Sequence, residues 1–404
     1  MGHLSNGWTA EERRIVLAAV VGTTASVFPA FLTGAVGVQL RDSIEVSDQQ
    51  LGVAIGAFFV SAALGSAALG GVAERLGGPR AMQLGLTMTV ITGLTIAAFG
   101  RSALSLTLLL LIAGGSNALT QPAANLMLAD GLGSQRLGLA LAFKQSGMPM
   151  ATLLGGLAVP SLAITLGWQW AFVAGAVMAG IALIALSQRN RGQERVVRRA
   201  VDATERPRPD LPSTLLVTYA LVGGLGAAAA GSLVGFLVSG GVESGIDPAV
   251  AGLLLTAGSV VGITARIVQG RLADSGRILP IKQLAVLFAL GSAGMVILSI
   301  HTPISYWIGI TLAFGCGWAW PGLFNLSVIR NNPSAPGAAT GVSQTGVYIG
   351  AGAGPAVGGW IIAGGGYPAL WLSGAAALVL ATGISVLLRR LVRSERERDV
   401  RLPT

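Results

Sequence analysis

The chain has 404 residues, of which 52% are hydrophobic and 11% charged, and its 26 basic and 17 acidic residues give a formal net charge of +9. A soluble domain carries roughly 25% charged residues, so this composition indicates an integral membrane protein rather than a nucleic-acid binder. The single cysteine excludes an internal disulfide, and the sequence lacks the phosphate-binding loop of an ATP-driven pump. No cofactor or metal site is expected.

Twelve apolar runs follow one another along the chain, each long enough for a membrane helix of roughly 20 residues. They cover 15–38, 49–73, 80–100, 103–129, 137–164, 168–186, 213–240, 249–270, 279–300, 303–329, 337–363 and 367–388. The charged N-terminal segment and the length of the first run predict a retained helix rather than a cleavable signal peptide. Because a backbone in lipid must form its hydrogen bonds internally, the runs predict an all-α integral membrane protein.

The basic residues predict how these helices are oriented in the membrane. With the N-terminus in the cytoplasm, 22 of the 26 Lys and Arg residues fall in cytoplasmic segments, and only Arg41 and Arg101 lie in loops on the opposite side. Cytoplasmic loops are rich in Lys and Arg, so both termini are expected in the cytoplasm. The compact loops, without glycosylated insertions, favour a bacterial inner membrane.

The longest hydrophilic stretch, 187–212, contains seven arginines and three prolines and predicts a cytoplasmic linker between two halves, 1–186 and 213–404. Residues recur across this linker at a separation of 200 positions. The recurring pairs include Gly52 and Gly252, Gly70 and Gly270, Ala73-Glu74 and Ala273-Asp274, and Asn125-Leu126 and Asn325-Leu326. The repeat predicts two pseudo-symmetric bundles of six helices each.

The connection after the second run carries the most specific motif, Gly70-Gly71-Val72-Ala73-Glu74-Arg75-Leu76-Gly77-Gly78-Pro79-Arg80. It resembles the G-x-L-A-D-R-x-G-R-R motif of the major facilitator superfamily of secondary transporters, with Glu74 replacing the usual Asp and Gly78-Pro79 replacing a basic pair. With the twelve runs, the resemblance covers essentially the whole chain and implies alternating access. It further implies gating residues in both copies of the motif, namely Gly70, Glu74, Arg75, Arg80, Gly270, Asp274 and Arg277. The alternative is a short turn whose arginines only set topology.

Two cations lie within predicted spans, where insertion scales put the cost of a central charge at about 3 kcal/mol. Lys144 lies about two turns inside the fifth run, and Arg266 lies one turn before Gly270 in the eighth. We expect Lys144 to face a central cavity as a substrate or coupling charge, and the alternative is a structural pair with Asp130. For Arg266 the alternatives are a salt bridge at the cytoplasmic gate and a role in the cavity.

Polar and aromatic side chains in other runs add to these cations. Asn117, Gln121 and Asn125 recur every four residues and share one helical face, where they either bond neighbouring helices or face the cavity. The family resemblance places the first, fourth, seventh and tenth spans around the cavity. Candidate binding residues in the second half are Trp318, Asn325, Gln344 and Tyr348.

No Asp or Glu lies in the middle of a predicted span, so a cavity holding Lys144 and Arg266 would favour an anion. The sequence therefore predicts a monomeric secondary transporter for a small organic anion such as a carboxylate. A proton or an exchanged anion is the expected coupled solute. No nucleic-acid partner and no catalytic residues are expected.

Two other functions stay open at this point. Efflux of drugs or other amphipathic compounds is favoured by aromatic residues and by glycines of the eleventh run, which resemble the family's antiporter motif: Gly341, Gly350, Gly354, Pro355, Gly358 and Gly359. The alternative interpretation of these glycines is helix packing with a proline bend. A non-transporting membrane receptor is the remaining alternative, and it lacks a sizeable soluble domain for signalling.

Overall fold

The computed structural model describes residues 8–132, 140–141, 143–189, 208–275 and 277–399. Eleven helices within these ranges are long and apolar enough to cross a membrane. The last of them, α14 (Pro336–Asp399), is interrupted at Gly366, where φ is +72°. As one straight helix of 64 residues it would be about 96 Å long, three times the hydrocarbon thickness. The helix α14 therefore supplies two spans, and the prediction of an all-α protein with twelve spans is confirmed.

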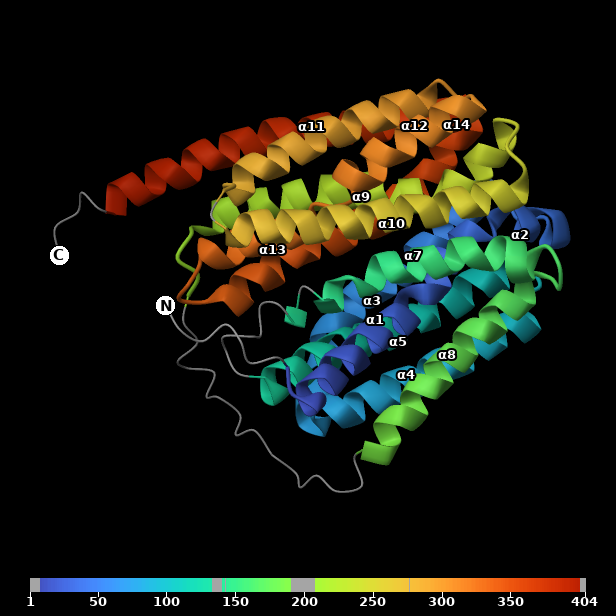
Figure 1. Ribbon diagram of the computed structural model, residues 1–404, viewed down its shortest axis with the longest axis horizontal. Coiled ribbons are helices and arrows are strands. Elements are labelled where there is room, and N and C mark those ends of the chain that lie inside the picture. The colour runs from blue at the N-terminus through green and yellow to red at the C-terminus, as the bar shows by residue number, and fades with distance from the viewer. Residues whose placement is uncertain (1–7, 133–139, 142, 190–207, 276, 400–404) are drawn as a thin grey trace.

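The helices form two groups that lie side by side (Figure 1). The first group contains α1 (Ala10–Ala35), α2 (Gly37–Ile44), α3 (Asp48–Leu76), α4 (Gly78–Phe99), α5 (Ala103–Gly131), α7 (Gly147–Ala158) with the π-helical turn η1 (Val159–Ala163), and α8 (Trp168–Arg189). The second group contains α9 (Ser213–Glu243), α10 (Pro248–Asp274), α11 (Pro280–Ser299), α12 (Pro303–Leu312) with the π-helical turn η4 (Ala313–Gly317), α13 (Pro321–Arg330) and α14. We call these groups the first and second bundle. Most of the predicted linker, 187–212, lies outside the described residues.

The starts of equivalent helices in the two bundles have the same local structure, 200 positions apart. Ser47 caps α3 and Asp247 caps α10, each through a side-chain oxygen. Ser102 caps α5 and Thr302 caps α12, each in a capping box closed by a serine three residues later. Such caps satisfy backbone N–H groups that have no partner within the helix. The sequence repeat is therefore also a repeat of the signals that begin helices.

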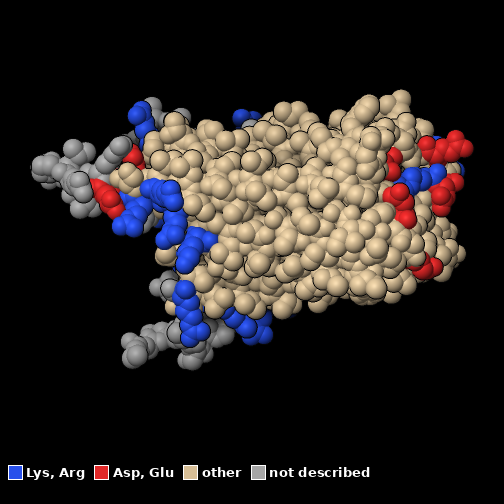
Figure 2. Space-filling view, turned by 90° about the horizontal axis from the view of Figure 1, so that it is seen from above, with Lys and Arg blue, Asp and Glu red and all other residues tan. Residues whose placement is uncertain are grey.

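Charged side chains gather at the two ends of the helices, and the belt between them is uncharged (Figure 2). Many large apolar side chains are exposed along the helices, so we call this the apolar belt. One end, which we call the basic end, carries exposed arginines that include Arg75, Arg80, Arg271, Arg330 and Arg389. The other, which we call the acidic end, carries Asp42, Glu45, Asp48, Glu243 and Asp247. Charges collected at both ends leave the side of the bundle free to contact lipid.

Glycine brings α9 and α14 into backbone contact. Gly346, Gly350 and Gly354 recur every four residues along α14, and a Cβ at these positions would lie 2.0, 1.9 and 2.3 Å from backbone carbonyl oxygens of α9. The closest of these oxygens belongs to Gly224. Small residues at this spacing let membrane helices pack closely. Glycines of the eleventh run therefore pack the seventh and eleventh spans together.

The two bundles contact each other at the acidic end and separate toward the basic end. Near the acidic end, a Cβ at Gly52 of α3 would lie 2.1 Å from the carbonyl oxygen of Pro355 in α14. Closer to the basic end, a Cβ at Gly70 of α3 or at Gly341 of α14 would have no described atom within 4 Å. Neither position therefore has a close neighbour among the described residues, and the ribbons of the two bundles diverge toward the basic end (Figure 1).

Replacing Gly350 with alanine tests the glycine contact. The added methyl group overlaps the Gly224 carbonyl, so α9 and α14 must move apart, and overpacking of this kind costs about 1–3 kcal/mol. We expect Gly350→Ala to lower the apparent Tm of the purified protein in detergent. The matched control is Gly383→Ala in the second span of α14, where a Cβ meets no described atom within 4 Å. An apparent Tm for Gly350→Ala equal to that of the control would contradict the role of this contact in packing.

Candidate functional site

Lys144 is buried at the start of the fifth candidate span, Phe143–Ala163, with 3% of its surface exposed. Its ammonium group donates a 3.1 Å hydrogen bond to Oδ1 of Asn125 in α5, and the Asn125 side chain is itself exposed. A neutral amide, rather than the carboxylate of Asp130, thus accepts the hydrogen bond from Lys144. One neutral acceptor compensates little of the cost of removing an ammonium group from water.

Arg266 of α10 connects the two bundles next to Lys144. Its Nη1 donates to the carbonyl oxygen of Gln145 in the first bundle at 3.3 Å, and its Nη2 donates to that of Trp318 in the second at 2.7 Å. The guanidinium carbon also lies 4.9 Å from the centroid of the Trp318 ring, a cation–π contact. Among the described residues, neither Arg266 nor Lys144 has an ion pair.

The three amides of the fourth span have different surroundings. Asn117 donates to Oγ of Ser26 in α1 at 3.0 Å, so it joins two helices of the first bundle. Gln121 is buried, and its Nε2 has no partner among the described residues. Asn125 accepts the hydrogen bond from Lys144. The stripe therefore combines a contact between helices at Asn117, an unpartnered buried amide at Gln121 and the acceptor of the buried cation at Asn125.

The second bundle repeats the contact between Asn125 and Lys144 at a separation of 200 positions. Nε2 of Gln344 in α14 donates to Oδ1 of Asn325 in α13 at 2.8 Å, and both side chains are half-buried. Tyr348, also half-buried, lies one turn beyond Gln344 in α14. In each bundle, an asparagine of the fourth or tenth span thus accepts a hydrogen bond from a side chain of the following span. The donor is charged in the first bundle (Lys144) and neutral in the second (Gln344).

Three buried N–H groups at or near these residues have no acceptor within the described part of the chain. They are Nε2 of Gln121, Nε of Arg266 and Nε1 of Trp320. Trp320 is 2% exposed and packs against the rings of Phe288 and Phe324. A buried donor without a partner costs about 1–3 kcal/mol. A ligand with several oxygen acceptors is the chemical complement of such donors.

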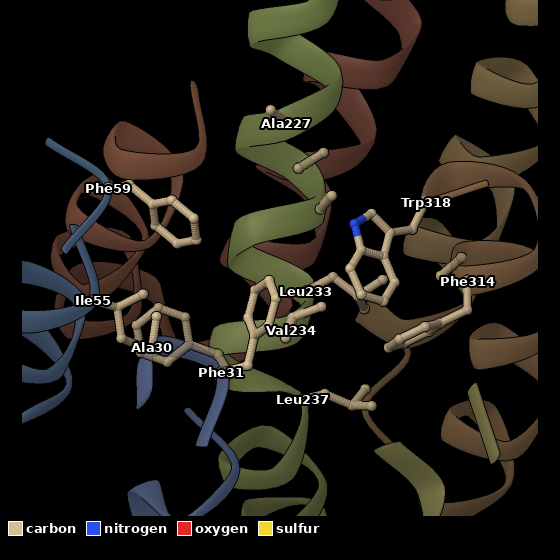
Figure 3. Packing of buried hydrophobic residues seen from close by; sticks show 14 of the residues in the cluster. Ala30, Phe31, Ile55, Phe59, Ala227, Leu233, Val234, Leu237, Phe314 and Trp318 are labelled. Carbon is tan, nitrogen blue, oxygen red and sulfur yellow. The ribbon is translucent and has the colours of Figure 1, made fainter. Parts of the chain in front are cut away.

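A cluster of four aromatic rings, which we call the aromatic seal, joins the bundles beside Arg266. Phe31 of α1 meets Trp318 of the second bundle edge to face, with ring centroids 6.1 Å apart. Phe59 of α3 packs on Phe31, and Phe314 of η4 packs on Trp318 (Figure 3). All four side chains are buried. Because Trp318 also contacts Arg266, the seal and the cation share one anchoring residue.

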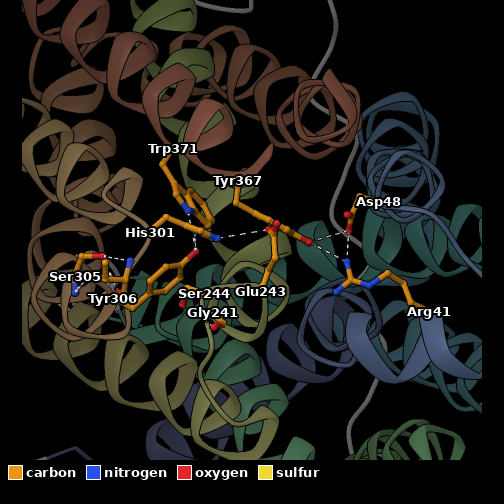
Figure 4. Close-up of polar contacts among 11 residues, drawn as sticks. Arg41, Asp48, Gly241, Glu243, Ser244, His301, Ser305, Tyr306, Tyr367 and Trp371 are labelled. Carbon is orange, nitrogen blue, oxygen red and sulfur yellow. Dashed lines mark hydrogen bonds and ion pairs between the residues drawn. The ribbon is translucent and has the colours of Figure 1, made fainter. Parts of the chain in front are cut away.

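A polar cluster at the acidic end, which we call the acidic-end latch, also joins the bundles (Figure 4). Arg41 of α2 forms an ion pair with Asp48 of α3, both in the first bundle. The Tyr367 hydroxyl of the second bundle accepts from Arg41 at 2.9 Å and donates to Asp48 at 3.0 Å. The ring of His301 stacks on that of Tyr367, and His301 pairs with Glu243 at 3.6 Å. Tyr367 therefore carries the hydrogen bonds of this cluster that cross between the bundles.

The acidic-end latch was not predicted from the sequence, in which Arg41 stood out only as a loop charge. Burial lowers the pKa of Arg41, but Tyr367 and Asp48 outweigh that effect and leave the pKa above its ordinary value. The available signal was that Arg41 is a rare basic residue on the acidic side, seven positions before Asp48. Tyr367 is 326 positions away from Arg41, and no pattern in the sequence connects the two.

The predicted gating residues lie apart from the contacts between the bundles. Glu74, Arg75, Arg80 and Arg277 are exposed at the basic end. Like Gly70, Gly270 would have no described atom within 4 Å of an added Cβ. The side chain of Asp274 lies outside what the structure describes. In this conformation, the described part of the gate motif is thus at the end where the bundles are separated.

The described residues include no group of three or more His, Cys, Asp and Glu side chains able to hold a metal ion. Comparison with curated proteins found no match. A family model described as Major Facilitator Superfamily matches residues 15–333, which is most of the chain and includes both copies of the gate motif. The match agrees with the all-helical fold and the apolar helices described above. The chain therefore belongs to the major facilitator superfamily of membrane transporters.

Proposed function

We propose that this transporter moves a small organic anion, such as a carboxylate, across the membrane. The observation that carries the proposal is that Lys144, which is buried, and Arg266, which is half-buried, have no ion pair among the described residues. A buried cation is stabilised by a nearby negative charge far more than by neutral dipoles. An anionic substrate would supply that charge whenever the site is occupied.

The contacts of the two cations support different roles. Lys144 has one acceptor, the exposed amide of Asn125, which a substrate carboxylate can replace. Arg266 is held by the carbonyl groups of Gln145 and Trp318 and by the Trp318 ring, so it positions Trp318. Its positive charge also favours an anion nearby. Gln121, Asn325, Gln344 and Tyr348 provide further hydrogen-bonding groups, and Trp318 provides an apolar wall. The selectivity of the site thus combines a charge from the first bundle with polar groups from both.

Transport would occur by alternating access, with 1–186 and 213–404 as the two moving units. The present conformation opens toward the basic end, which we assign to the cytoplasm because Lys and Arg mark cytoplasmic loops. Both termini then lie in the cytoplasm of a bacterial cell. Opening to the other side requires the acidic-end latch and the aromatic seal to separate and the bundles to close at the gate motif. Exchange with a second anion or symport with a proton would couple the cycle.

Efflux of amphipathic compounds is the second candidate function. The aromatic seal favours it, because four buried rings beside Arg266 form a surface suited to flat apolar molecules. Such a transporter would not depend on the charge of Lys144. The two candidates therefore differ in their response to loss of that charge.

Replacement of Lys144 with glutamine tests the anion proposal directly. The variant keeps a donor for Asn125 and makes the first bundle resemble the second, where Gln344 occupies this role. We expect uptake of carboxylates into proteoliposomes, measured with a radiolabelled panel, to fall at least tenfold. A loss of about 1.4 kcal/mol of substrate binding is sufficient for this change.

Arg14→Gln is the matched control, since it also removes one positive charge but from an exposed position near the N-terminus. It should transport at the rate of the unmodified protein. Undiminished carboxylate uptake by a correctly folded Lys144→Gln variant would refute the role of Lys144. Undiminished extrusion of a lipophilic dye by the same variant, in the absence of carboxylate transport, would favour the efflux alternative.

Replacement of Tyr367 with phenylalanine tests the acidic-end latch. The ring can still stack on His301, but the bonds to Arg41 and Asp48 are lost, and hydrogen bonds to charged groups contribute about 1.5–3 kcal/mol each. We expect the population open at the acidic end to rise at least tenfold. Distances between spin labels on cysteines at the exposed positions Asp42 and Ile304, with Cys316 replaced by serine, would measure it.

Tyr306→Phe is the control for this experiment. The Tyr306 hydroxyl lies at the same end but accepts from Trp371 and contacts His301 within the second bundle. Its loss should affect stability without changing the distances between the bundles. The role of the latch is refuted if Tyr367→Phe leaves the distance distribution unchanged or if both variants shift it equally.

A further inference from the structure

A cavity lies at the basic end of the second bundle, away from Lys144. Its volume is about 720 Å³, and its walls come from α11, α13 and α14. Four cationic residues line it: Lys282, Arg330, Arg389 and Arg393. All of its lining residues belong to the second bundle, so motion between the bundles does not need to open or close it.

Positive charge dominates this cavity. Glu397 is the one carboxylate among the lining residues that the structure describes, and it pairs with Arg393 at 2.8 Å. Lys282 and Arg389 are exposed and have no ion pair among the described residues. The Asn331 amide and the Ser327 hydroxyl also line the cavity. The cations match the oxygens of a phosphate group, whereas the Asn331 amide and the Ser327 hydroxyl already bond to Tyr219.

The cavity lies where the apolar belt meets the basic end. The helix α11 begins at Pro280 and α13 ends at Arg330, so both helices enter or leave the membrane at this level. Large apolar side chains in or next to the lining are exposed, with Leu279 at 60%, Leu391 at 40% and Ile329 at 39%. A ligand with an anionic head and apolar chains would contact the cations and this apolar surface at the same time.

We propose that this cavity binds the headgroup of an anionic phospholipid from the membrane leaflet at the basic end. Basic pockets between membrane helices on the cytoplasmic side are suited to such headgroups. The exposed apolar side chains favour a lipid over a free phosphate, since a soluble anion would leave them without a partner. Lipid binding here would hold the ends of α11, α13 and α14 together at the membrane surface.

Native mass spectrometry of the delipidated full-length protein tests this site. The protein is titrated with phosphatidylglycerol and, separately, with phosphatidylcholine. The double variant Lys282→Gln/Arg389→Gln should bind phosphatidylglycerol about 30-fold more weakly than the unmodified protein, from about 1 kcal/mol for each basic residue. The control variant Arg14→Gln/Arg271→Gln removes two exposed charges that do not line the cavity and should bind as the unmodified protein does.

Inorganic phosphate and glycerol 3-phosphate form the soluble arm of the experiment, with thermal stabilisation as the readout. We expect no stabilisation at concentrations where phosphatidylglycerol saturates the site. Equal binding of phosphatidylglycerol by both double variants would overturn the site. Stabilisation by the soluble phosphates that requires Lys282 and Arg389, without preferential retention of phosphatidylglycerol, would overturn the assignment to a lipid. Unchanged phosphatidylcholine binding in both variants shows that they remain folded.

Discussion

The cost of burying positive charge in a medium of low dielectric governs the centre of this protein. Lys144 and Arg266 lie on different bundles, the first buried and the second half-buried, and neither has a carboxylate partner among the described residues. Arg266 is stabilised by two backbone carbonyl groups and the face of Trp318, whereas Lys144 has a single amide. Neutral groups offset the desolvation cost of an ammonium group less well than that of a guanidinium group. Lys144 therefore gains more than Arg266 from an anionic ligand.

The rest of the fold places these charges at the interface between the bundles. Glycines let the helices approach at the acidic end, as at Gly52, and within each bundle, as at Gly350. The acidic-end latch and the aromatic seal join the bundles on that side, and the contact of Arg266 with Gln145 is on the same interface. Closer to the basic end, a Cβ added at Gly70 or Gly341 would have no described atom within 4 Å. A conformational cycle therefore has two kinds of contact to exchange: polar and aromatic contacts at the acidic end, and the gate motif at the basic end.

Much of the fold was predictable because a membrane requires apolar segments long enough to cross it and backbones that form all their hydrogen bonds internally. The twelve spans and the 200-residue repeat follow from apolar runs and from recurring residues, and the caps at Ser102 and Thr302 repeat in the structure. The site was predictable only in part. That Lys144 bonds to Asn125 rather than Asp130 depends on the rotation of two helices, which a four-residue periodicity does not fix. The bond from Tyr367 to Arg41 joins residues from different bundles, so no local pattern predicts it.

Ligand-induced thermal stabilisation of the purified protein is the sharpest test of an anion site at Lys144 and Arg266, because it depends on neither the direction of transport nor the coupled solute. Binding to the folded state alone stabilises by about 2.7 kcal/mol at a ligand concentration of 100 times Kd. A screen would compare small organic anions with lipophilic cations, using the unmodified protein. We expect a concentration-dependent rise in Tm with at least one class of carboxylate. Stabilisation by lipophilic cations and by no organic anion would contradict an anion site.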